Sequence, residues 1–438
     1  NGGLTQGGGT VNMNAAGMTG GTLSINGGTF NLNTASVGNT ATNIGGGTIV
    51  GVGEPMTLGG SGTIGGSFTL GTTASTALTL SGNFEVNGGA RRTITVPTTG
   101  PGLAGTSGTV HTLTGSLSPV NGPSVLQFAA TGTSSDTASG EVVLAGTNTL
   151  NGSIWTNSNN NMRINTGPAG IGIVQSDVMV RFASPSALPS GNGGADAWIV
   201  AAGRNKAGGR YGYLLTGSPG GQTYELGAGY KFVLGGQLNA VLGSTGGNTT
   251  FENSSVAIWD GNSTTGSLGV NILVRDGVFT LGSPGKPVTF QGVGTTNVLT
   301  TDGGLGAAAT PLLDSTGSRF MDKRGPGEVV LSNIQYKKVD GTTDATAAFA
   351  WRLFEGTLTQ TAAGQLRNGV GSFDFDDWFN NGTTTAKTLN ITAEELFSTT
   401  LAGQFQNNTE LRVAGGVTFT TTQTAEELSP VANDAVLR

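Results

Sequence analysis

The chain of 438 residues contains no cysteine, a single histidine, and few charged or aromatic side chains. Without cysteine, disulfides, thiolate metal sites and cysteine nucleophiles are excluded. Charged residues make up 11% of the chain and aromatic residues 6%, and the net charge of −6 argues against a nucleic-acid partner. No apolar run approaches the roughly 20 residues that a membrane-spanning helix requires, so we expect no membrane span.

Glycine is the residue in excess, with 78 copies. Average usage is about 7%, so glycine is more than twice as frequent as in an ordinary globular protein. No Gly-X-Y period is present, which excludes collagen, and the low charge argues against charged disorder. Threonine, asparagine, serine, alanine, valine and leucine supply most of the remainder. This composition favours an all-β chain of short strands and tight turns.

A Gly-Gly-Thr phrase or a close variant recurs near the N-terminus, at residues 7–14, 20–26, 27–33, 45–50, 60–64 and 65–70. In the first copies, apolar and polar residues alternate after the glycines, which is typical of a half-buried strand. Glycine also supplies the positive φ angles of turns. The intervals between phrases are irregular, which favours a solenoid with three faces per coil over a strict hexapeptide helix. We therefore predict a β-solenoid with about 20–25 residues per coil.

Charge divides the chain unevenly. Residues 1–140 contain five charged side chains, namely Glu54, Glu85, Arg91, Arg92 and Asp136. All other charges, all five tryptophans and the longer loops lie in residues 141–438. We predict a low-charge solenoid part over 1–140 and a more charged part over 141–438, either as two parts or as one continuous solenoid. Short helices are expected near 392–397 and 424–428. The chain starts at Asn1 without a signal peptide, so we expect a trimmed piece of a longer product.

Three later segments share a further pattern. Residues 323–333 combine a Lys-x-Gly-x-Gly opening with a strand, residues 354–359 contain a closing Gly-Thr-Leu strand, and residues 140–152 contain a strand and a turn. This pattern resembles the autotransporter-associated β-strand repeat of large bacterial surface proteins. The resemblance implies a right-handed parallel β-helix on a bacterial surface. From the residues themselves we expect short loop or helix insertions in the C-terminal part of that fold. It carries over no catalytic residues, because that family shares none.

The sharpest acidic cluster consists of Asp374, Asp376 and Asp377. Carboxylate oxygens are the ligands that Ca²⁺ prefers, and a pair of carboxylates serves glycosidases. In a strand, Asp374 and Asp376 would share one face. We interpret the cluster first as a solvated strand edge or corner, second as a Ca²⁺ site and third as a catalytic pair. Calcium is accordingly the one cofactor that we consider.

His111 and one aromatic group are two further candidate sites. His111 is the only histidine available to a Ser-His-Asp triad, and no nucleophile-elbow pattern surrounds a serine, so we predict a structural role for it. A second group lies in a glycine-rich stretch and is either a carbohydrate-stacking or subunit-contact surface or part of a core hairpin. Its members are Tyr211, Tyr213, Tyr224, Tyr230, Arg204, Lys206 and Arg210.

These features favour a non-enzymatic structural protein, a subunit of an extracellular filament, fibre or surface layer. A solenoid that associates end to end forms an open homopolymer, because such a contact does not close. The alternative is a monomeric autotransporter-type adhesin that binds glycans or host surfaces. The third hypothesis is a polysaccharide lyase or hydrolase on a β-helix. We expect an extracellular or cell-surface location, most simply in a bacterium.

Overall fold

A computed structural model of the chain describes part of its residues, and every structural statement below refers to that part. The described ranges are 3–14, 20–34, 36–72, 74–88, 91–97, 109–122, 124–131, 140–151, 154–156, 178–189, 198–203, 211–227, 230–236, 240–259, 268–293, 298–299, 305–306, 319–337, 349–363, 365–366, 370–372, 386–393, 395–397, 409–415, 419–421 and 436–437.

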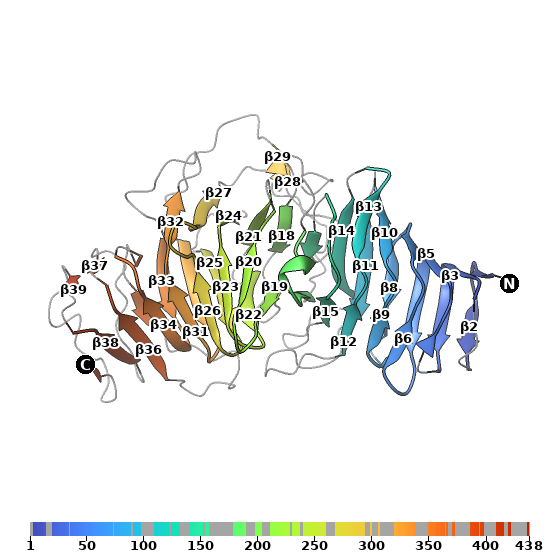
Figure 1. Cartoon of the computed structure of the whole chain (residues 1–438), viewed down its shortest axis with the longest axis horizontal. Helices are drawn as coiled ribbons and strands as arrows, with labels where there is room; N and C mark the ends of the chain where they lie inside the picture. Colours follow the sequence, from blue (N-terminus) through green and yellow to red (C-terminus); the bar gives the residue numbers. More distant parts are fainter. Residues whose placement is uncertain are drawn as a thin grey trace, which may run out of the picture. The chain divides into compact units, whose positions relative to one another are not determined.

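The chain folds into two compact units (Figure 1). Unit 1 comprises Asn1–Tyr213, Leu226–Val233 and Asn297–Ala307, and unit 2 comprises Leu214–Glu225, Leu234–Thr296 and Ala308–Arg438. The described part is all-β apart from one short 3-10 helix, η1 (Pro185–Ala187). It contains no helix that is long and apolar enough to cross a membrane.

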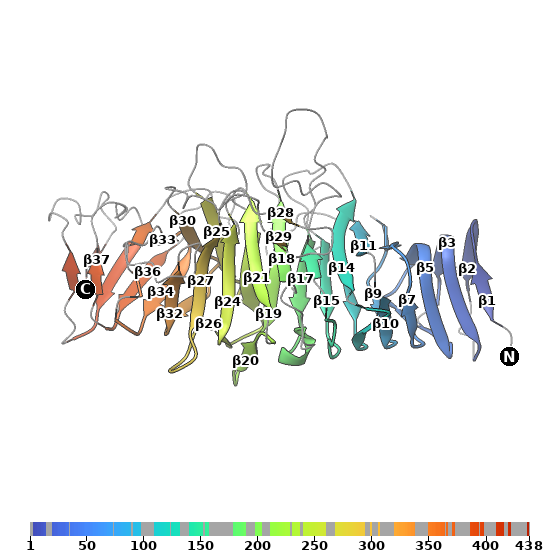
Figure 2. The same ribbon diagram turned by 90° about the horizontal axis from the view of Figure 1, so that it is seen from above.

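Unit 1 is built from three parallel β-ladders, which Figure 2 shows as strands lying side by side. Ladder 1A contains β1 (Leu4–Gln6), the first half of β3 (Thr22–Leu32), the first half of β5 (Ala41–Gly51), β7 (Gly62–Ile64), β10 (Phe84–Asn87) and β13 (Leu117–Val120). Ladder 1B contains β2 (Thr10–Met13), the second halves of β3 and β5, β8 (Phe68–Leu70), β11 (Arg91–Pro97), β14 (Val125–Thr131), β16 (Ile154–Thr156) and β18 (Trp198–Gly203). Ladder 1C contains β4 (Ser36–Val37), β6 (Met56–Leu58), β9 (Leu78–Leu80), β12 (Val110–Leu113), β15 (Gly140–Leu144) and β17 (Val178–Phe182). The short antiparallel pair β28 (Val298–Leu299) and β29 (Leu305–Gly306) also belongs to unit 1.

Unit 2 repeats the arrangement. Ladder 2A contains β24 (Ser254–Trp259), β27 (Val288–Val293) and β32 (Ile334–Lys337). Ladder 2B contains β22 (Ala240–Thr245), β25 (Leu268–Val274), β30 (Arg319–Arg324), β33 (Phe349–Leu353) and β35 (Val370–Ser372). Ladder 2C contains β20 (Gln222–Glu225), β23 (Thr249–Glu252), β26 (Val278–Leu281), β31 (Glu328–Leu331), β34 (Gly356–Gln360), β36 (Lys387–Ile391), β38 (Thr409–Val413) and β40 (Val436–Leu437). β37 (Glu395–Phe397) pairs with β39 (Phe419–Thr421), and β19 (Tyr211–Thr216) and β21 (Lys231–Gly236) contain the limits of the units.

This architecture confirms the predicted parallel β-solenoid. Side-chain hydrogen bonds between neighbouring coils span 19 residues from Asn12 to Asn31 and 20 from Asn43 to Thr63. These coils are about as short as the sequence pattern predicts. Later coils are longer, with 33 residues from Asn83 to Ser116, because the segments that join their strands are longer.

The core consists of apolar rows that run from coil to coil. Ile25, Ile44, Ile64 and Val86 occupy one register position of ladder 1A, and each is at most 1% exposed. Burial in β3 alternates along the strand, so the period of two seen in the sequence places these side chains inward. Stacking of like residues buries apolar surface continuously, which is how a repeat protein stabilises each coil through its neighbours.

The Gly-Gly-Thr phrases form a corner of the coil. Gly9, Gly28 and Gly47 have φ angles of 66°, 71° and 82° and stand at the same place on three successive coils. A Cβ atom on Gly28 would overlap the carbonyl oxygen of Gly9. The threonine that follows each glycine begins the next half-strand, so the phrase marks both the turn and the strand start, as the sequence indicates.

We expect Gly28→Ala to lower the free energy of unfolding of unit 1 by about 1–3 kcal/mol, because alanine is strained at this φ. The clash with Gly9 adds to the loss. Urea denaturation followed by far-UV circular dichroism measures the change. Gly8→Ala is the matched control, because Gly8 has open space around its Cβ position and an ordinary φ. Equal stability of the two variants would contradict this account of the corner.

The two short helices and the boundary near residue 140 that the sequence predicts have different outcomes. The helix expected near 392–397 is wrong, because Glu395–Phe397 is strand β37 and pairs in parallel with β39. A backbone partner in a parallel ladder outweighs the weak helical pattern of these six residues. The helix expected near 424–428 lies outside the described residues. β12 pairs with β15 across residue 140, inside unit 1, and the boundary proposed there stays a prediction.

Candidate functional site

The acidic cluster Asp374, Asp376 and Asp377 lies outside the described residues, so its three interpretations stay predictions. Within the part of the chain that the structure describes, no group of three or more histidine, aspartate or glutamate side chains is arranged to hold a metal ion.

His111 is a core residue of ladder 1C. Its side chain is 1% exposed, and its Nδ1 accepts a hydrogen bond of 3.2 Å from the backbone N–H of Leu78 on the preceding coil. Burial lowers the pKa of the imidazole to about 4. The ring is thus neutral at pH 7 and bonded to the backbone, in keeping with the structural role that the sequence predicts.

The tyrosines of the glycine-rich stretch do not form a surface. Tyr213 and Tyr224 are fully buried and Tyr230 is 5% exposed, and each hydroxyl donates to a backbone carbonyl at 2.6–3.0 Å. Tyr213 stacks on Phe182 with ring centroids 5.7 Å apart. Burial raises the pKa of the Tyr224 and Tyr230 hydroxyls. The interface interpretation is wrong for these three residues, because adjacent coils cover their rings. Arg204, Lys206, Arg210 and the side chain of Tyr211 lie outside the described part.

Unit 2 contains a buried charge cluster made of Asp322, Lys323, Arg324, Arg352 and Glu355. Lys323 takes an inward position of β30, beside Ile272 and Leu353, and is fully buried. Its Nζ donates to the carbonyl oxygens of Arg324 at 3.1 Å, Gly325 at 2.5 Å and Glu355 at 2.9 Å. Burial lowers the pKa of the ammonium to about 7, against the opposing charges of Glu355 and Glu328. Lys323 therefore satisfies three carbonyls where the chain turns out of β30.

Asp322 forms the other half of the buried charge cluster. Arg352, its register partner on β33, donates from Nε to Oδ1 at 2.5 Å and from Nη2 to Oδ2 at 2.6 Å. The second guanidinium, that of Arg324, lies 3.9 Å from Asp322 Oδ2 and stacks on Phe354 with its Cζ 3.7 Å from the ring centroid. Burial, the larger effect, raises the pKa of the Asp322 carboxyl, and the two guanidiniums oppose it. The two parallel hydrogen bonds from Arg352 to Asp322 link β30 to β33.

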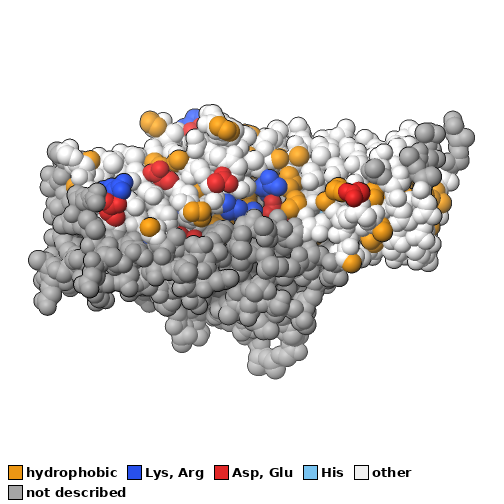
Figure 3. All heavy atoms as spheres, turned by 90° about the horizontal axis from the view of Figure 1, so that it is seen from below, with side chains coloured by type: hydrophobic (Ala, Val, Ile, Leu, Met, Phe, Trp, Pro, Cys, Tyr) orange, Lys and Arg blue, Asp and Glu red, His pale blue; other side chains and the backbone are white. Residues whose placement is uncertain are grey.

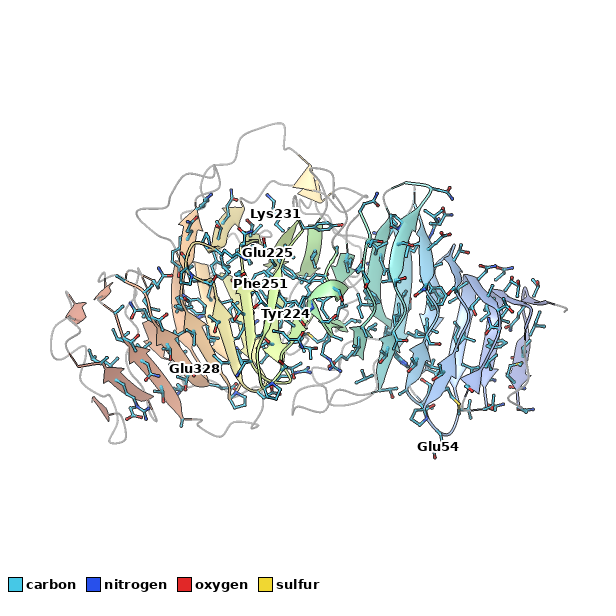
Figure 4. All side chains as sticks on the ribbon, in the orientation of Figure 1. Glu54, Tyr224, Glu225, Lys231, Phe251 and Glu328 are labelled. Atoms are coloured by element: carbon cyan, nitrogen blue, oxygen red, sulfur yellow. The ribbon has the colours of Figure 1, made fainter. Side chains whose placement is uncertain are left out.

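A surface charge cluster joins three coils of ladder 2C. Lys286 Nζ lies 2.7 Å from Glu252 Oε1 and 3.4 Å from Glu225 Oε2, and Ser283 Oγ donates to Glu252 Oε2 at 2.5 Å. Asn253 Nδ2 donates to Oε1 of Glu225. Figure 4 labels the residue Glu225. The Lys286 hydrogen bond lowers the pKa of Glu252 most, followed by the hydrogen bond from Ser283. A carboxylate with a lowered pKa is a weak base, so this group suits a link better than acid–base catalysis.

Amide and hydroxyl side chains also link the coils. Asn31 Nδ2 donates to Asn12 Oδ1 at 2.7 Å, and Asn33 repeats the contact with Asn14 at 2.6 Å. In ladder 2C, Thr359 Oγ1 donates to Glu328 at 2.5 Å and accepts from Asn390 at 3.0 Å. Asparagine and threonine at one register position therefore form ladders along the stack.

Sequence reasoning missed the buried charge cluster. Its signal is the Lys-x-Gly-x-Gly opening at 323–327, in which the lysine stands two residues before Gly325, a corner glycine with φ 82°. The pairing of Asp322 with Arg352 had no signal, because the two residues are 30 apart in sequence and lie on strands of successive coils.

These clusters hold coils together, and the described residues of each are bonded to one another. Comparisons with protein-family models, curated proteins and solved structures find no match to this chain. The fold therefore stands on the structure alone, and the resemblance to the autotransporter-associated repeat stays a prediction.

Proposed function

We propose that the chain is a structural, non-enzymatic β-solenoid that serves as a subunit of an extracellular filament, fibre or surface layer. The observation that carries the proposal is the use of its charged and amide side chains. Asp322–Arg352, Glu252–Lys286 and Glu141–Arg181 each join neighbouring coils, the last at 2.7 Å. Charged side chains that bond to neighbouring coils stabilise the stack, and this supports a role in which the protein must keep its shape.

The proposal predicts that the purified chain forms ordered filaments or sheets as its concentration rises, because stacked coils and their repeated side-chain rows provide periodic contacts. Negative-stain electron microscopy over a range of concentrations measures this. Single particles of one size at every concentration would contradict self-assembly.

Ordered assembly must be separated from aggregation. The Asp322→Ala variant, which we expect to loosen unit 2, is the control for this purpose. If the unmodified chain forms filaments of uniform width and the variant does not, the result supports assembly of the folded protein. Irregular clumps formed equally by both proteins would count against the proposal.

A further inference from the structure

The outer surface of ladder 1B has one threonine per coil. Thr10, Thr29, Thr48, Thr69 and Thr95 pair in register along β2, β3, β5, β8 and β11, and we call them the threonine row. Thr10 is exposed and the others are half-buried by their neighbours in the row. Among the described residues, none of these five hydroxyls has a hydrogen-bond partner. Each can donate and accept one further bond.

The surface around the threonine row is uncharged. β2, β3, β5 and β8 contain no charged residue, and the nearest charges of the ladder, Arg91 and Arg92, stand at the start of β11. Glu54, the one charged residue before position 85, points away from the turn between β5 and β6 (Figure 4). On the face seen in Figure 3, the N-terminal part is mostly uncharged. A charged polymer would lose hydration here without gaining a counter-charge, so the row fits a neutral partner.

The size of the row limits the partner further. Coils stack about 4.8 Å apart, so five threonines extend over about 19 Å, and the strand width of three to four residues is about 10–13 Å. The strip is therefore roughly 190–250 Å² in area, well below the ~800 Å² that each partner buries in a stable protein interface. Gly27 and Gly46 lie on one side of the row without side chains. On the other side, Asn12 and Asn31 are hydrogen-bonded to each other, so the five threonine hydroxyls form a single file of unpaired groups.

From these observations we propose that the threonine row binds an extended neutral polysaccharide that lies along the coil stack. One pyranose unit advances such a chain by about the same distance as one coil. Each threonine then offers one hydroxyl to a sugar hydroxyl or ring oxygen and one methyl to the sugar's C–H surface. This binding role goes beyond the structural role proposed above and does not depend on self-assembly.

The test uses the purified chain and a panel of neutral hexasaccharides, namely β-1,4-glucan, β-1,3-glucan and β-1,4-mannan, measured by titration calorimetry. Binding of at least one hexasaccharide, tighter than the disaccharide of the same linkage, is expected. Removing three hydroxyls in the Thr29→Val/Thr48→Val/Thr69→Val variant should weaken that binding about tenfold or more. Valine keeps the shape and strand preference of threonine, so the variant is expected to fold.

The matched control is Thr57→Val/Thr79→Val/Thr112→Val, which removes three hydroxyls from a register row of ladder 1C. It should bind as the unmodified chain does, and Thr48→Ser, which keeps the hydroxyl, should do so too. The proposal is overturned if no neutral hexasaccharide binds, if both triple variants lose binding equally, or if a disaccharide binds as tightly. Binding only to the charged polymer polygalacturonate would also overturn the proposal. So would arrest of ice growth, or dimerisation through the row, if no sugar binds.

Discussion

Asp322→Ala is expected to lower the free energy of unfolding of unit 2 by about 3–5 kcal/mol, the usual cost of removing one partner of a buried ion pair. Asp322 is 1% exposed, and its two oxygens accept both bonds of the Arg352 fork. After the substitution the guanidinium of Arg352, whose side chain is 14% exposed, keeps its charge but loses this carboxylate. Hydrogen-exchange protection of β30 and β33, together with denaturant unfolding, measures the loss.

Two further variants test the cause. Asp322→Leu combined with Arg352→Met replaces the pair by apolar side chains and should recover most of the stability, because desolvation of the two charges is then avoided. Arg412→Met removes the exposed partner of Glu410, which lies 2.6 Å away, and should leave the unfolding midpoint unchanged. A loss for Asp322→Ala no larger than for Arg412→Met would show that the pair does not hold β30 to β33.

The part of the fold that could be predicted from the sequence is the part set by local pattern. Strict alternation after the first Gly-Gly-Thr phrases placed Leu23, Ile25 and Phe30 inward, and all three are fully buried. Glycine at 28 and 47 marked the corners, because few other residues adopt these φ angles. Such signals lie within a few residues of one another, so a single sequence contains them.

The buried charge cluster and the tyrosine core depend on which coils become neighbours. Tyr230 bonds to the carbonyl of Leu150 across 80 residues, and no local pattern encodes that separation. The glycine-rich surroundings of these tyrosines therefore left both a surface and a core hairpin open. Coil lengths in unit 1 vary from 19 residues, between Thr10 and Thr29, to 45 residues, between Ile154 and Ile199, so register cannot be counted forward along the chain. Contacts between residues far apart in the sequence can be identified only once the pairing of the coils is known.

His111 supplies the second large effect, a loss of stability in mild acid. Its pKa is lowered to about 4 in the folded protein by burial, against an ordinary value of 6.5. Between these values the unfolded chain binds more protons than the folded chain, so the free energy of unfolding falls as the pH falls from 6.5 to 4. The full difference corresponds to about 3 kcal/mol. Protonation also turns Nδ1 into a donor that faces the N–H of Leu78, so the hydrogen bond of 3.2 Å is lost.

Because the chain contains a single histidine, this effect can be assigned without ambiguity. His111→Asn keeps an acceptor near the Nδ1 position but does not titrate, so its stability should be lower at pH 7 and change much less from pH 7 to pH 5. Urea unfolding at stepped pH compares the two proteins above the range in which most carboxyls titrate. An NMR titration of the one imidazole gives the pKa directly. The role of a buried neutral histidine in linking β9 to β12 would be disproved if the imidazole titrates near 6.5 in the folded protein. It would also be disproved if the free energy of unfolding of the wild-type protein changes with pH as little as that of His111→Asn.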